Sequence, residues 1–471
     1  MKFENRVFRL RDPEKIFGNI EKEIDPELEN GYFYFSDKEQ LNDPMEGHIN
    51  LYWEGDYVAW MGLFKNYVWQ LFYTIYYYLP LGASLAELER LFLTRSEAGL
   101  KGTKVIEHRR IVENSFASNE KIKIIATTLE ESKSKIGYEE LSIVLLWVHT
   151  DALTCVYDTL KEVGNEEFFR WLDDAKNISF NNISDISFSE LLSDQVKFKS
   201  MSYAVKNTMN QMTLIMGKKR SDEDLERFKI HKFIFLEFAN NYANKLQRLA
   251  LSDGYCVSFT TKINNPALWG YYTDNHKGIA LIFDYHESES IDLYQYKNED
   301  RKVGEKAELL RVLYEPNESI NFFMTLGHLF GDERQHWLTH ENRKSVFLEE
   351  YKKIDYGKWY YQKLTERFLK KDKTWKDEDE LRIVLNDDWE YHGTPEKRSY
   401  KYDFSRLKGI VFGMRTTYDD KIRIIDILQK KCRENNVNEF EVYEATFNSE
   451  SNEMEFDRMR MVEESILKKE G

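Results

Sequence analysis

The chain has 471 residues, more than one compact domain usually contains, so we expect two units or one domain with a large insertion. Hydrophobic residues make up 42% of the chain and aromatic residues 15%, which excludes a largely disordered protein. The net charge of −15 excludes a general attraction to nucleic acid, so binding of DNA or RNA would require a local basic patch.

The cysteines and the N-terminal residues indicate the compartment. Cys155, Cys256 and Cys432 are widely spaced and odd in number, which fits neither a disulfide framework nor a zinc pattern. The first eleven residues carry charges where a signal peptide has its apolar run. We therefore expect a cytoplasmic protein with no metal site and no membrane span.

The N-terminal block reads as strand, short helix and strand. Residues 3–10 and 31–36 are predicted strands, and a helix opens at Pro13. A turn is expected at Asn42 and Asp43, because their side chains bond the local backbone and proline follows. Either these residues form a plain turn, or they join a cleft together with Glu46.

Residues 55–250 are predicted to form an all-helical insertion, because Pro80 is the one proline between Pro44 and Pro266. The aromatic stretch 67–81 is too short and too polar to span a bilayer, which takes about 20 apolar residues, so we expect a buried or partly buried helix there. An aromatic hairpin at 57–81 is the expected surface if the insertion binds a partner. Helical periodicity predicts further helices at 85–93, 105–118, 139–163, 166–175, 187–216 and 222–251.

Strand patterns return after residue 250, so the α+β part is expected to be discontinuous, formed by 1–54 and 251–455, with 456–471 as a C-terminal tail. The predicted strands are 254–260, 279–283, 310–314 and 439–446, and the predicted helices are 320–330, 343–370 and 419–434.

The stretch from Trp375 to Leu385 carries the strongest chemical signal. As a strand it places Glu378, Glu380 and Arg382 on one face, and Leu381, Ile383 and Leu385 on the buried face. Two carboxylates about 7 Å apart with a guanidinium beyond them form a candidate site. The alternative is a solvated strand face with one surface ion pair, which contributes at most about 1 kcal/mol.

Five segments together resemble the bacterial family called domain of unknown function 2971. They are Tyr34 to Glu46, Trp269 to Gly278, Val312 to Tyr314, Trp375 to Arg382 and Gly409 to Gly413. The resemblance covers roughly 250 residues and leaves out 55–250.

Three motifs in chain order are also similar to those of ADP-ribosyltransferases of the arginine-serine-glutamate type. Arg9 stands on the first predicted strand, Ser258 with Thr260 on the second, and Glu378 with Glu380 on a later one. Arg6 and Arg11 compete for the first place. The resemblance implies a split mixed-sheet ADP-ribosyltransferase-like domain and NAD as a substrate.

This resemblance assigns roles to the motif residues. Glu380 would stabilise positive charge that develops on the ribose, and Glu378 would orient or deprotonate the acceptor. Arg9 would bind the pyrophosphate and Ser258 the ribose, with Thr260 and Arg382 beside them. Flat faces for the rings of NAD would come from Trp269 and Tyr272. His276 is either a turn residue or a substrate contact.

Our leading hypothesis is an NAD-dependent ADP-ribosyltransferase that modifies a protein or nucleic-acid acceptor, in a toxin or phage-defence setting. An NAD glycohydrolase would share the site and lack an acceptor. Two alternatives stay open: a metal-dependent nuclease using Asp377, Glu378 and Glu380, and a sensor or scaffold that binds a partner through the helical insertion.

Overall fold

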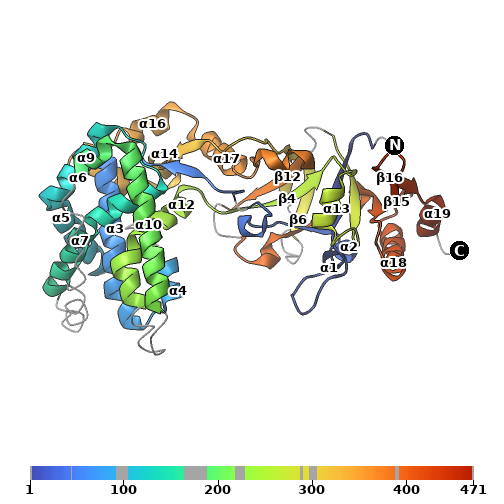
Figure 1. The fold of residues 1–471 in the computed structure, drawn as a ribbon, viewed down its shortest axis with the longest axis horizontal. Coiled ribbons are helices and arrows are strands. Elements are labelled where there is room, and N and C mark those ends of the chain that lie inside the picture. The colour runs from blue at the N-terminus through green and yellow to red at the C-terminus, as the bar shows by residue number, and fades with distance from the viewer. Residues whose placement is uncertain are drawn as a thin grey trace. The chain divides into compact units, whose positions relative to one another are not determined.

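The computed structural model describes residues 3–43, 45–91, 104–163, 188–217, 229–286, 290–295, 305–387 and 392–468. The chain forms two compact units (Figure 1). Unit 1 consists of residues 1–48, 252–317 and 362–471, and unit 2 consists of residues 49–251 and 318–361. The predicted helix at 166–175 and the start of the one at 222–251 lie outside the described residues.

Unit 1 combines short helices with two sheets. Its strands are β1 (Arg6–Arg11), β2 (Tyr32–Tyr34), β4 (Gly254–Thr260), β5 (Ile279–Asp284), β6 (Ser290–Gln295), β7 (Glu305–Glu308), β8 (Leu310–Arg311), β12 (Glu380–Asn386), β13 (Ser399–Tyr402), β14 (Leu407–Phe412), β15 (Glu441–Asn448) and β16 (Glu453–Arg458). Its helices are α1 (Pro13–Phe17), α2 (Glu27–Asn30), η1 (Lys38–Gln40), α13 (Pro266–Tyr272), η7 (Lys373–Glu378), η8 (Pro395–Arg398), η9 (Phe404–Arg406), α18 (Tyr418–Glu434) and α19 (Arg460–Leu467).

The main sheet of unit 1 is mixed and has eight strands in the order β16-β15-β14-β5-β1-β4-β12-β8. Its pairs are antiparallel except for β14 and β15, which are parallel. β1 pairs with β5 over six positions, from Arg6 to Arg11, but meets β4 at Phe8 and Thr260 alone. The sheet therefore separates between β1 and β4, although the three strands with the predicted motifs are neighbours.

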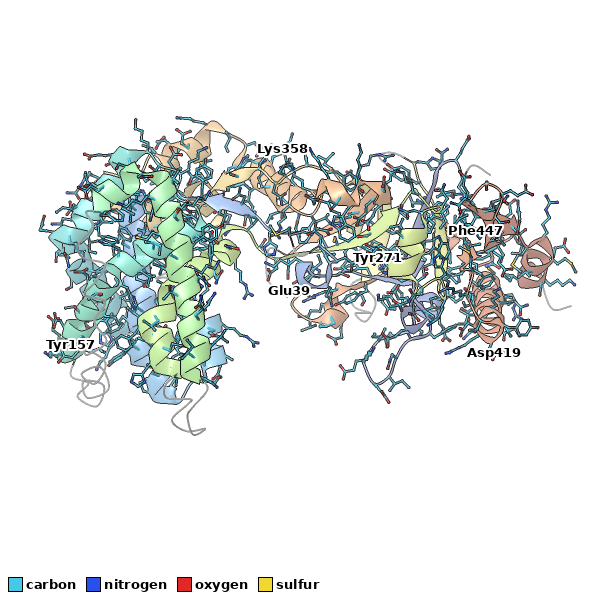
Figure 2. All side chains as sticks on the ribbon, in the orientation of Figure 1. Glu39, Tyr157, Tyr271, Lys358, Asp419 and Phe447 are labelled. Atoms are coloured by element: carbon cyan, nitrogen blue, oxygen red, sulfur yellow. The ribbon has the colours of Figure 1, made fainter. Side chains whose placement is uncertain are left out.

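The principal core of unit 1 lies between this sheet and a second one with the order β2-β13-β6-β7. Phe33 of β2 packs edge-on against Phe259 with ring centroids 5.4 Å apart, and it stacks on Tyr402 at 4.4 Å. α18 buries Ile424, Leu428 and Cys432, which recur every four residues on one face, as expected for an amphipathic helix. Asp419, near the start of α18, is exposed (Figure 2).

Unit 2 is mainly helical. Its helices are α3 (Tyr57–Tyr73), η2 (Thr74–Tyr78), η3 (Leu79–Leu81), α4 (Leu85–Arg90), α5 (Lys104–Ser118), α6 (Glu120–Ser132), α7 (Tyr138–Glu162), α9 (Phe188–Ser193), α10 (Gln195–Gly217), η5 (Phe233–Glu237), α12 (Phe238–Ala250), α14 (Phe322–Thr325), η6 (Leu326–His328), α15 (Gly331–Leu338) and α16 (Phe347–Lys353). Short strands are β3 (Asn50–Tyr52), β9 (Ser319–Asn321), β10 (Thr339–His340) and β11 (Arg343–Lys344), and α17 (Tyr356–Glu366) runs from unit 2 into unit 1.

α3 is the central helix of unit 2. Every residue from Tyr57 to Phe72 is buried, and α5, α6, α7 and α15 pack around the helix. The buried helix expected within 67–81 is therefore present. The expectation that an aromatic hairpin at 57–81 provides a partner surface is wrong for α3, because its side chains fill the core of unit 2.

The structure differs from the predicted domain boundaries at three segments. Residues 49–54 and 318–361, which we had assigned to the α+β part, pack in unit 2, where β9 pairs in parallel with β3. Residues 456–471 are not simply a tail, because they include the end of β16 and the helix α19, whose Ile466 is fully buried. All three segments owe their place to long-range packing, which local periodicity does not encode.

One helix of the described residues, α7, is long and apolar enough to span a membrane. In its most apolar window, 56% is buried inside unit 2, where α7 packs against α3, α5, α10 and α12. This degree of burial is the pattern of a core helix.

Unit 2 also buries a charged cluster in which Glu333 is poorly satisfied. Arg109 binds Glu113 at 2.8 Å, and His336 contacts the same Glu113 oxygen at 3.0 Å. Glu333 accepts from the Trp337 indole at 3.2 Å, but its Oε2 has no hydrogen-bond partner among the described residues. Burial raises the pKa of Glu333 to about 7, despite the nearby charge of Arg109.

We predict that Glu333→Gln removes a pH-dependent loss of stability. A raised folded-state pKa means that the wild-type protein is stabilised below pH 4.5 and loses this contribution as pH rises toward 7. The free energy of unfolding of the variant, measured with urea, should therefore exceed that of wild type, and the difference should grow from pH 5 to pH 8 to about 1–3 kcal/mol. The exposed Glu131→Gln on α6 serves as control, and an equal pH trend in both variants would contradict the prediction.

Candidate functional site

A cavity of about 200 Å³, partly open to solvent, lies in unit 1 where β1 and β4 separate. It is lined by Phe8, Arg9, Leu10, Arg11, Asp12, Lys15, Ser36, Gln40, Leu41, Asn42, Glu46, Cys256, Val257, Ser258, Phe259, Thr260, Leu268, Tyr271, Tyr272, Lys371, Glu378, Glu380 and Arg382. These residues come from the beginning, middle and end of the chain. The separation of the two strands creates the space, because side chains there have no partner strand directly opposite.

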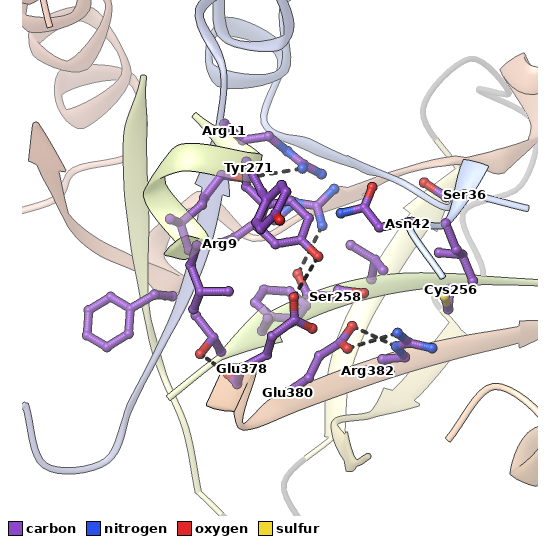
Figure 3. A pocket seen from close by; sticks show the side chains of 18 of the residues that line it. Arg9, Arg11, Ser36, Asn42, Cys256, Ser258, Tyr271, Glu378, Glu380 and Arg382 are labelled. Carbon is purple, nitrogen blue, oxygen red and sulfur yellow. Dashed lines mark hydrogen bonds and ion pairs between the residues drawn. The ribbon is translucent and has the colours of Figure 1, made fainter. Parts of the chain in front are cut away.

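The cavity unites nine of the twelve residues that the sequence singled out. They are Arg9, Asn42, Glu46, Ser258, Thr260, Tyr272, Glu378, Glu380 and Arg382. Arg9 and Asn42 lie across the cavity from Glu378 and Glu380 (Figure 3). The exposed ring of Tyr271, 6.3 Å from that of Trp375, stands at its rim.

Asp43, Trp269 and His276 do not line the cavity. The indole of Trp269 is fully buried and donates to the carbonyl of Ile263 at 2.8 Å, which makes it a core residue. His276 stacks on Trp269 in the loop that precedes β5. Asp43 accepts the backbone N–H of Met45 at 2.9 Å, as expected for a plain turn.

The register of β4 and β12 places four of the predicted residues on one face. Thr260 pairs with Glu380, and Ser258 pairs with Arg382. Residues directly opposite in an antiparallel pair share a face, so these side chains point together toward the cavity. The intervening Leu381 and Ile383 are buried in the principal core, as the alternating pattern predicted.

Arg9 starts from the opposite face of the sheet. Phe8 pairs with Thr260, so the next residue of β1 turns toward the principal core. The Arg9 guanidinium lies 5.5 Å above Phe33 and donates to the carbonyl of Ser258 at 3.2 Å. It reaches the cavity past the edge of β4, and its Nε is buried without a hydrogen-bond partner among the described residues.

Glu378 is not a strand residue, which corrects the predicted alternation at this point. It ends the short helix η7, and Asp379 follows in a left-handed conformation with φ of 44° before β12 begins at Glu380. The Thr260 hydroxyl donates to the carbonyl of Glu378 and fixes this turn. The Glu378 carboxylate still enters the cavity, because the turn directs its side chain to the face on which alternation along a continuous strand would have placed it.

A buried charge network joins the site residues. Lys371 Nζ lies 2.9 Å from Glu46, 2.6 Å from Glu378 and 3.2 Å from Glu380. Arg382 binds Glu380 through Nε at 2.7 Å and Nη2 at 2.8 Å, and its Nη2 is 2.6 Å from Glu46. All five side chains are buried, so two cations compensate two of the three carboxylates away from water, and one negative charge remains when all three carboxylates are ionised.

Lys371 is the member of this network that sequence reasoning missed. The run from Lys370 to Lys373 has the composition of a solvated charge cluster, whereas Lys371 is only 4% exposed. Its ammonium group also lies 4.7 Å from the ring centre of Trp375. One signal of burial in the local sequence is the pair of aromatic residues that flank the run, Phe368 and Trp375. Aromatic side chains are usually buried, and they can cover the side chain of a neighbouring lysine.

The environment in the network shifts the pKa values of Glu380 and Glu378 in opposite directions. Burial disfavours ionised Glu380, but the charges of Arg382 and Lys371 outweigh it, and hydrogen bonds from Arg382 and Ser258 help to lower its pKa to about 2. Burial raises the pKa of Glu378 above its usual value, in spite of Lys371. Glu378 also accepts the Tyr272 hydroxyl at 3.1 Å. Paired carboxylates with separated pKa values can divide acid and base roles.

The opposite side of the cavity is cationic. Arg11 is bound to Glu27 at 2.6 Å and Lys15 to Asp12 at 3.0 Å, so both charges are already compensated. Arg9 has no carboxylate partner among the described residues and bonds to backbone carbonyls. A ligand with an anionic group would therefore meet Arg9 on one side of the cavity and the carboxylates on the other.

Comparison with known proteins identifies one segment of the chain. No curated protein and no solved structure matches the sequence. Residues 268–383 match the family model described as Protein of unknown function (DUF2971), in agreement with the family expected from the motifs. This segment contains Lys371, Glu378, Glu380 and Arg382, so four residues of the charge network lie within the matched residues.

Proposed function

We propose that the chain is an NAD-dependent ADP-ribosyltransferase-like enzyme, acting in unit 1 on a protein or nucleic-acid acceptor, with NAD hydrolysis as the reaction when no acceptor is bound. The observation that supports this most is the meeting of Arg9, Ser258, Glu378 and Glu380 at one cavity, although up to 371 residues separate them in the chain. The proposal includes an ADP-ribosyltransferase-like fold for the split sheet and a toxin or phage-defence setting.

The arrangement suits cleavage of a glycosidic C–N bond. When that bond breaks, its electron pair leaves with nicotinamide and the ribose acquires oxocarbenium character. An ionised Glu380, held in place by Arg382 and the Ser258 hydroxyl, supplies the negative charge that favours this state. Arg9 offers an unused buried donor, Nε, for a phosphate oxygen.

Glu378 is the better group for proton transfer. Both oxygens of Glu380 are occupied by Arg382 and Lys371, whereas one oxygen of Glu378 accepts a neutral hydroxyl, that of Tyr272. An acceptor hydroxyl could replace Tyr272 there. As the acceptor atom forms its bond to the ribose, its proton passes to Glu378, whose pKa is raised by burial, so that it takes up a proton more readily than Glu380 does.

The geometry favours this chemistry over a metal-dependent nuclease. That alternative needs Asp377 to converge with Glu378 and Glu380, but Asp377 is exposed while both glutamates are buried. The oxygens that would bind a cation are instead occupied by Lys371 and Arg382. Within the described ranges, no three His, Cys, Asp or Glu side chains are grouped so as to hold a metal ion.

We predict that Glu378→Gln lowers NAD consumption by about 10²–10⁴-fold, the usual contribution of a general base. The amide keeps the size of the side chain and can still accept the Tyr272 hydroxyl, so the fold should persist. Release of nicotinamide from purified protein would be followed by chromatography, and circular dichroism would check folding.

The matched control is Glu366→Gln, a glutamate of α17 outside the cavity that is bound to Lys363 at 2.8 Å. It should leave NAD consumption unchanged. Wild-type protein that releases no nicotinamide, alone or with candidate protein and nucleic-acid acceptors, would contradict the proposed function, and so would a folded Glu378→Gln variant with full turnover.

A further inference from the structure

Unit 2 contains a cavity of its own, about 270 Å³ in volume, that the proposed reaction does not use. It lies among α4, α7, α10, η5 and α12. The residues that line it are Glu89, Glu139, Ser142, Ile143, Leu146, Ser202, Val205, Lys206, Asn210, Phe233, Leu236, Glu237, Asn240, Asn241 and Asn244.

Three amide side chains from little more than one turn of α12 define its polar wall: Asn240, Asn241 and Asn244. The Tyr138 hydroxyl lies 2.6 Å from Asn244 Oδ1, and the Ser142 hydroxyl lies 3.3 Å from Asn240 Oδ1. Two separate hydroxyl hydrogens can thus satisfy both amide oxygens. Tyr138 and Ser142, from the first turns of α7, hold the amides of α12 in fixed orientations.

The remaining polar atoms of these amides are unused. Asn241 donates through Nδ2 to the carbonyl of Glu89 at 3.3 Å, but its buried Oδ1 has no hydrogen-bond partner among the residues that the structure describes. Within the part of the chain that the structure describes, the NH₂ groups of Asn240 and Asn244 donate no hydrogen bond. Because native proteins rarely leave a buried acceptor unsatisfied, Asn241 indicates a missing partner. The three amides of α12 thus offer two donor groups and one acceptor.

A rare backbone feature stands beside the amides. Phe233–Glu237 form one π-helical turn, a geometry that is uncommon and frequent at functional sites. The turn is held by a buried chain in which the Tyr67 hydroxyl lies 2.6 Å from His149 Nδ1 and His149 Nε2 lies 2.8 Å from the carbonyl of Ile234. Burial lowers the pKa of His149 to about 4, so the ring is neutral and donates to that carbonyl. The turn is therefore a supported part of the cavity wall.

The charges at the rim exclude an anionic ligand. Glu89, Glu139 and Glu237 line the cavity, and Lys206 is the single cation of the lining. Lys206 is bound to Glu139 at 3.1 Å, and Lys232 is bound to Glu237 at 2.9 Å. A phosphate or carboxylate would therefore meet carboxylates and cations that are already paired. Apart from Ser142, Ser202 and Asn210, the other lining side chains are apolar: Ile143, Leu146, Val205, Phe233 and Leu236. A sugar would leave hydroxyls unsatisfied against this surface, whereas a flat heterocycle has apolar faces and polar edges.

We infer that this cavity binds an uncharged nucleobase-type heterocycle, as the base of a nucleoside, through the amides of Asn240, Asn241 and Asn244. Asparagine side chains match the donor and acceptor edges of bases. The free groups of these three amides, two donors and one acceptor, complement an arrangement of two acceptors and one donor. Uracil and cytosine each present this arrangement on one edge, and adenine presents it across N1, N6 and N7.

The test uses the full chain with uridine, cytidine and adenosine as probes and ribose as the negative probe, in isothermal titration calorimetry. We expect at least one nucleoside to bind and ribose not to bind. Asn241→Leu and Asn244→Leu should each weaken binding at least about tenfold, as expected for the loss of one polar contact. The exposed Asn207→Leu on α10, outside the cavity, should bind like wild type.

Absence of binding for all three nucleosides would overturn the inference, and so would binding that both cavity variants retain. If Asn241→Leu fails to fold by circular dichroism, Asn244→Leu decides, because Asn244 is exposed at the rim and tolerates substitution. Glu378→Gln should leave nucleoside binding unchanged, so failure of the proposed reaction in unit 1 and failure of this site are distinguishable.

Discussion

Arg382→Met is expected to destabilise unit 1 by about 3–5 kcal/mol, the usual consequence of removing one partner from a buried ion pair. Arg382 is 1% exposed, and its guanidinium binds Glu380 twice, Glu46 once and the carbonyl of Phe368 at 2.8 Å. Methionine fills similar volume but leaves Glu46 and Glu380 buried with Lys371 as the one remaining cation of the network. The electrostatic attraction that is lost with the guanidinium therefore exceeds the free energy that is saved because no guanidinium charge has to be desolvated.

Hydrogen exchange of the β4 and β12 amides measures this loss in unit 1, and urea unfolding measures it for the whole chain. Arg311→Met is the matched control. Arg311 lies on β8 beside β12, but it is about half exposed and 3.6 Å from the partly exposed Asp379. Such a pair contributes at most about 1 kcal/mol, so equal destabilisation by both variants would contradict a special role for the buried network.

Lys371→Met should be comparably destabilising at neutral pH, by about 3–5 kcal/mol, with a distinctive pH dependence. Three buried carboxylates would then share Arg382 alone, which raises their pKa values in the folded state. Burial already raises the pKa of Glu378 in the wild-type protein. Protonation of the folded variant relieves the repulsion, so its deficit relative to wild type should shrink as pH falls from 8 to 5.

Urea midpoints at a series of pH values would test this expectation. The exposed Lys373→Met is the control and should change stability little at any pH. A deficit of Lys371→Met that stays constant from pH 8 to 5 would show that the loss comes from packing against Trp375 rather than from charge.

The same network changes how Glu380→Gln must be interpreted. The role that the sequence assigns to Glu380 predicts that this substitution abolishes turnover, and a solvated strand face would predict that folding stays intact. In the structure, Glu380 neutralises Arg382 and Lys371 in the protein interior, and its pKa lowered to about 2 means that its contribution to stability is lost only as pH falls from about 4.5 toward 2. Glu378→Gln is therefore the cleaner test of chemistry.

Alternation along the chain was sufficient to predict much of the candidate site. Leu381 and Ile383 face the core, and Ser258, Thr260, Glu380 and Arg382 share the other face of two paired strands. These predictions held because the side-chain period of a strand is local and because burial of one face fixes the register. The same reasoning anticipated the buried α3 and the helical character of residues 57–162 in the described ranges.

The local sequence pattern did not predict the orientation of a side chain where a turn or a distant segment determines it. Glu378 reaches the cavity from a turn and Arg9 reaches it from the opposite face of the sheet. Trp269 was judged suitable for ligand stacking but fills a core, because both roles favour the same aromatic surface.

The sequence by itself determined strands such as β4 and β5, helices such as α7 and α18, and the residue types available for chemistry, since these follow from periodicity and side-chain character over a few residues. It did not determine the region 343–370, where one helix was predicted and the structure has β11, α16 and α17. Only the tertiary structure decided that Glu46 and Lys371 join Glu378, Glu380 and Arg382 in one buried network, and that three asparagines of α12 line a second cavity. The physical reason is that charge compensation and cavities depend on which segments meet after folding, and contacts across more than 300 residues leave no periodic trace in the chain.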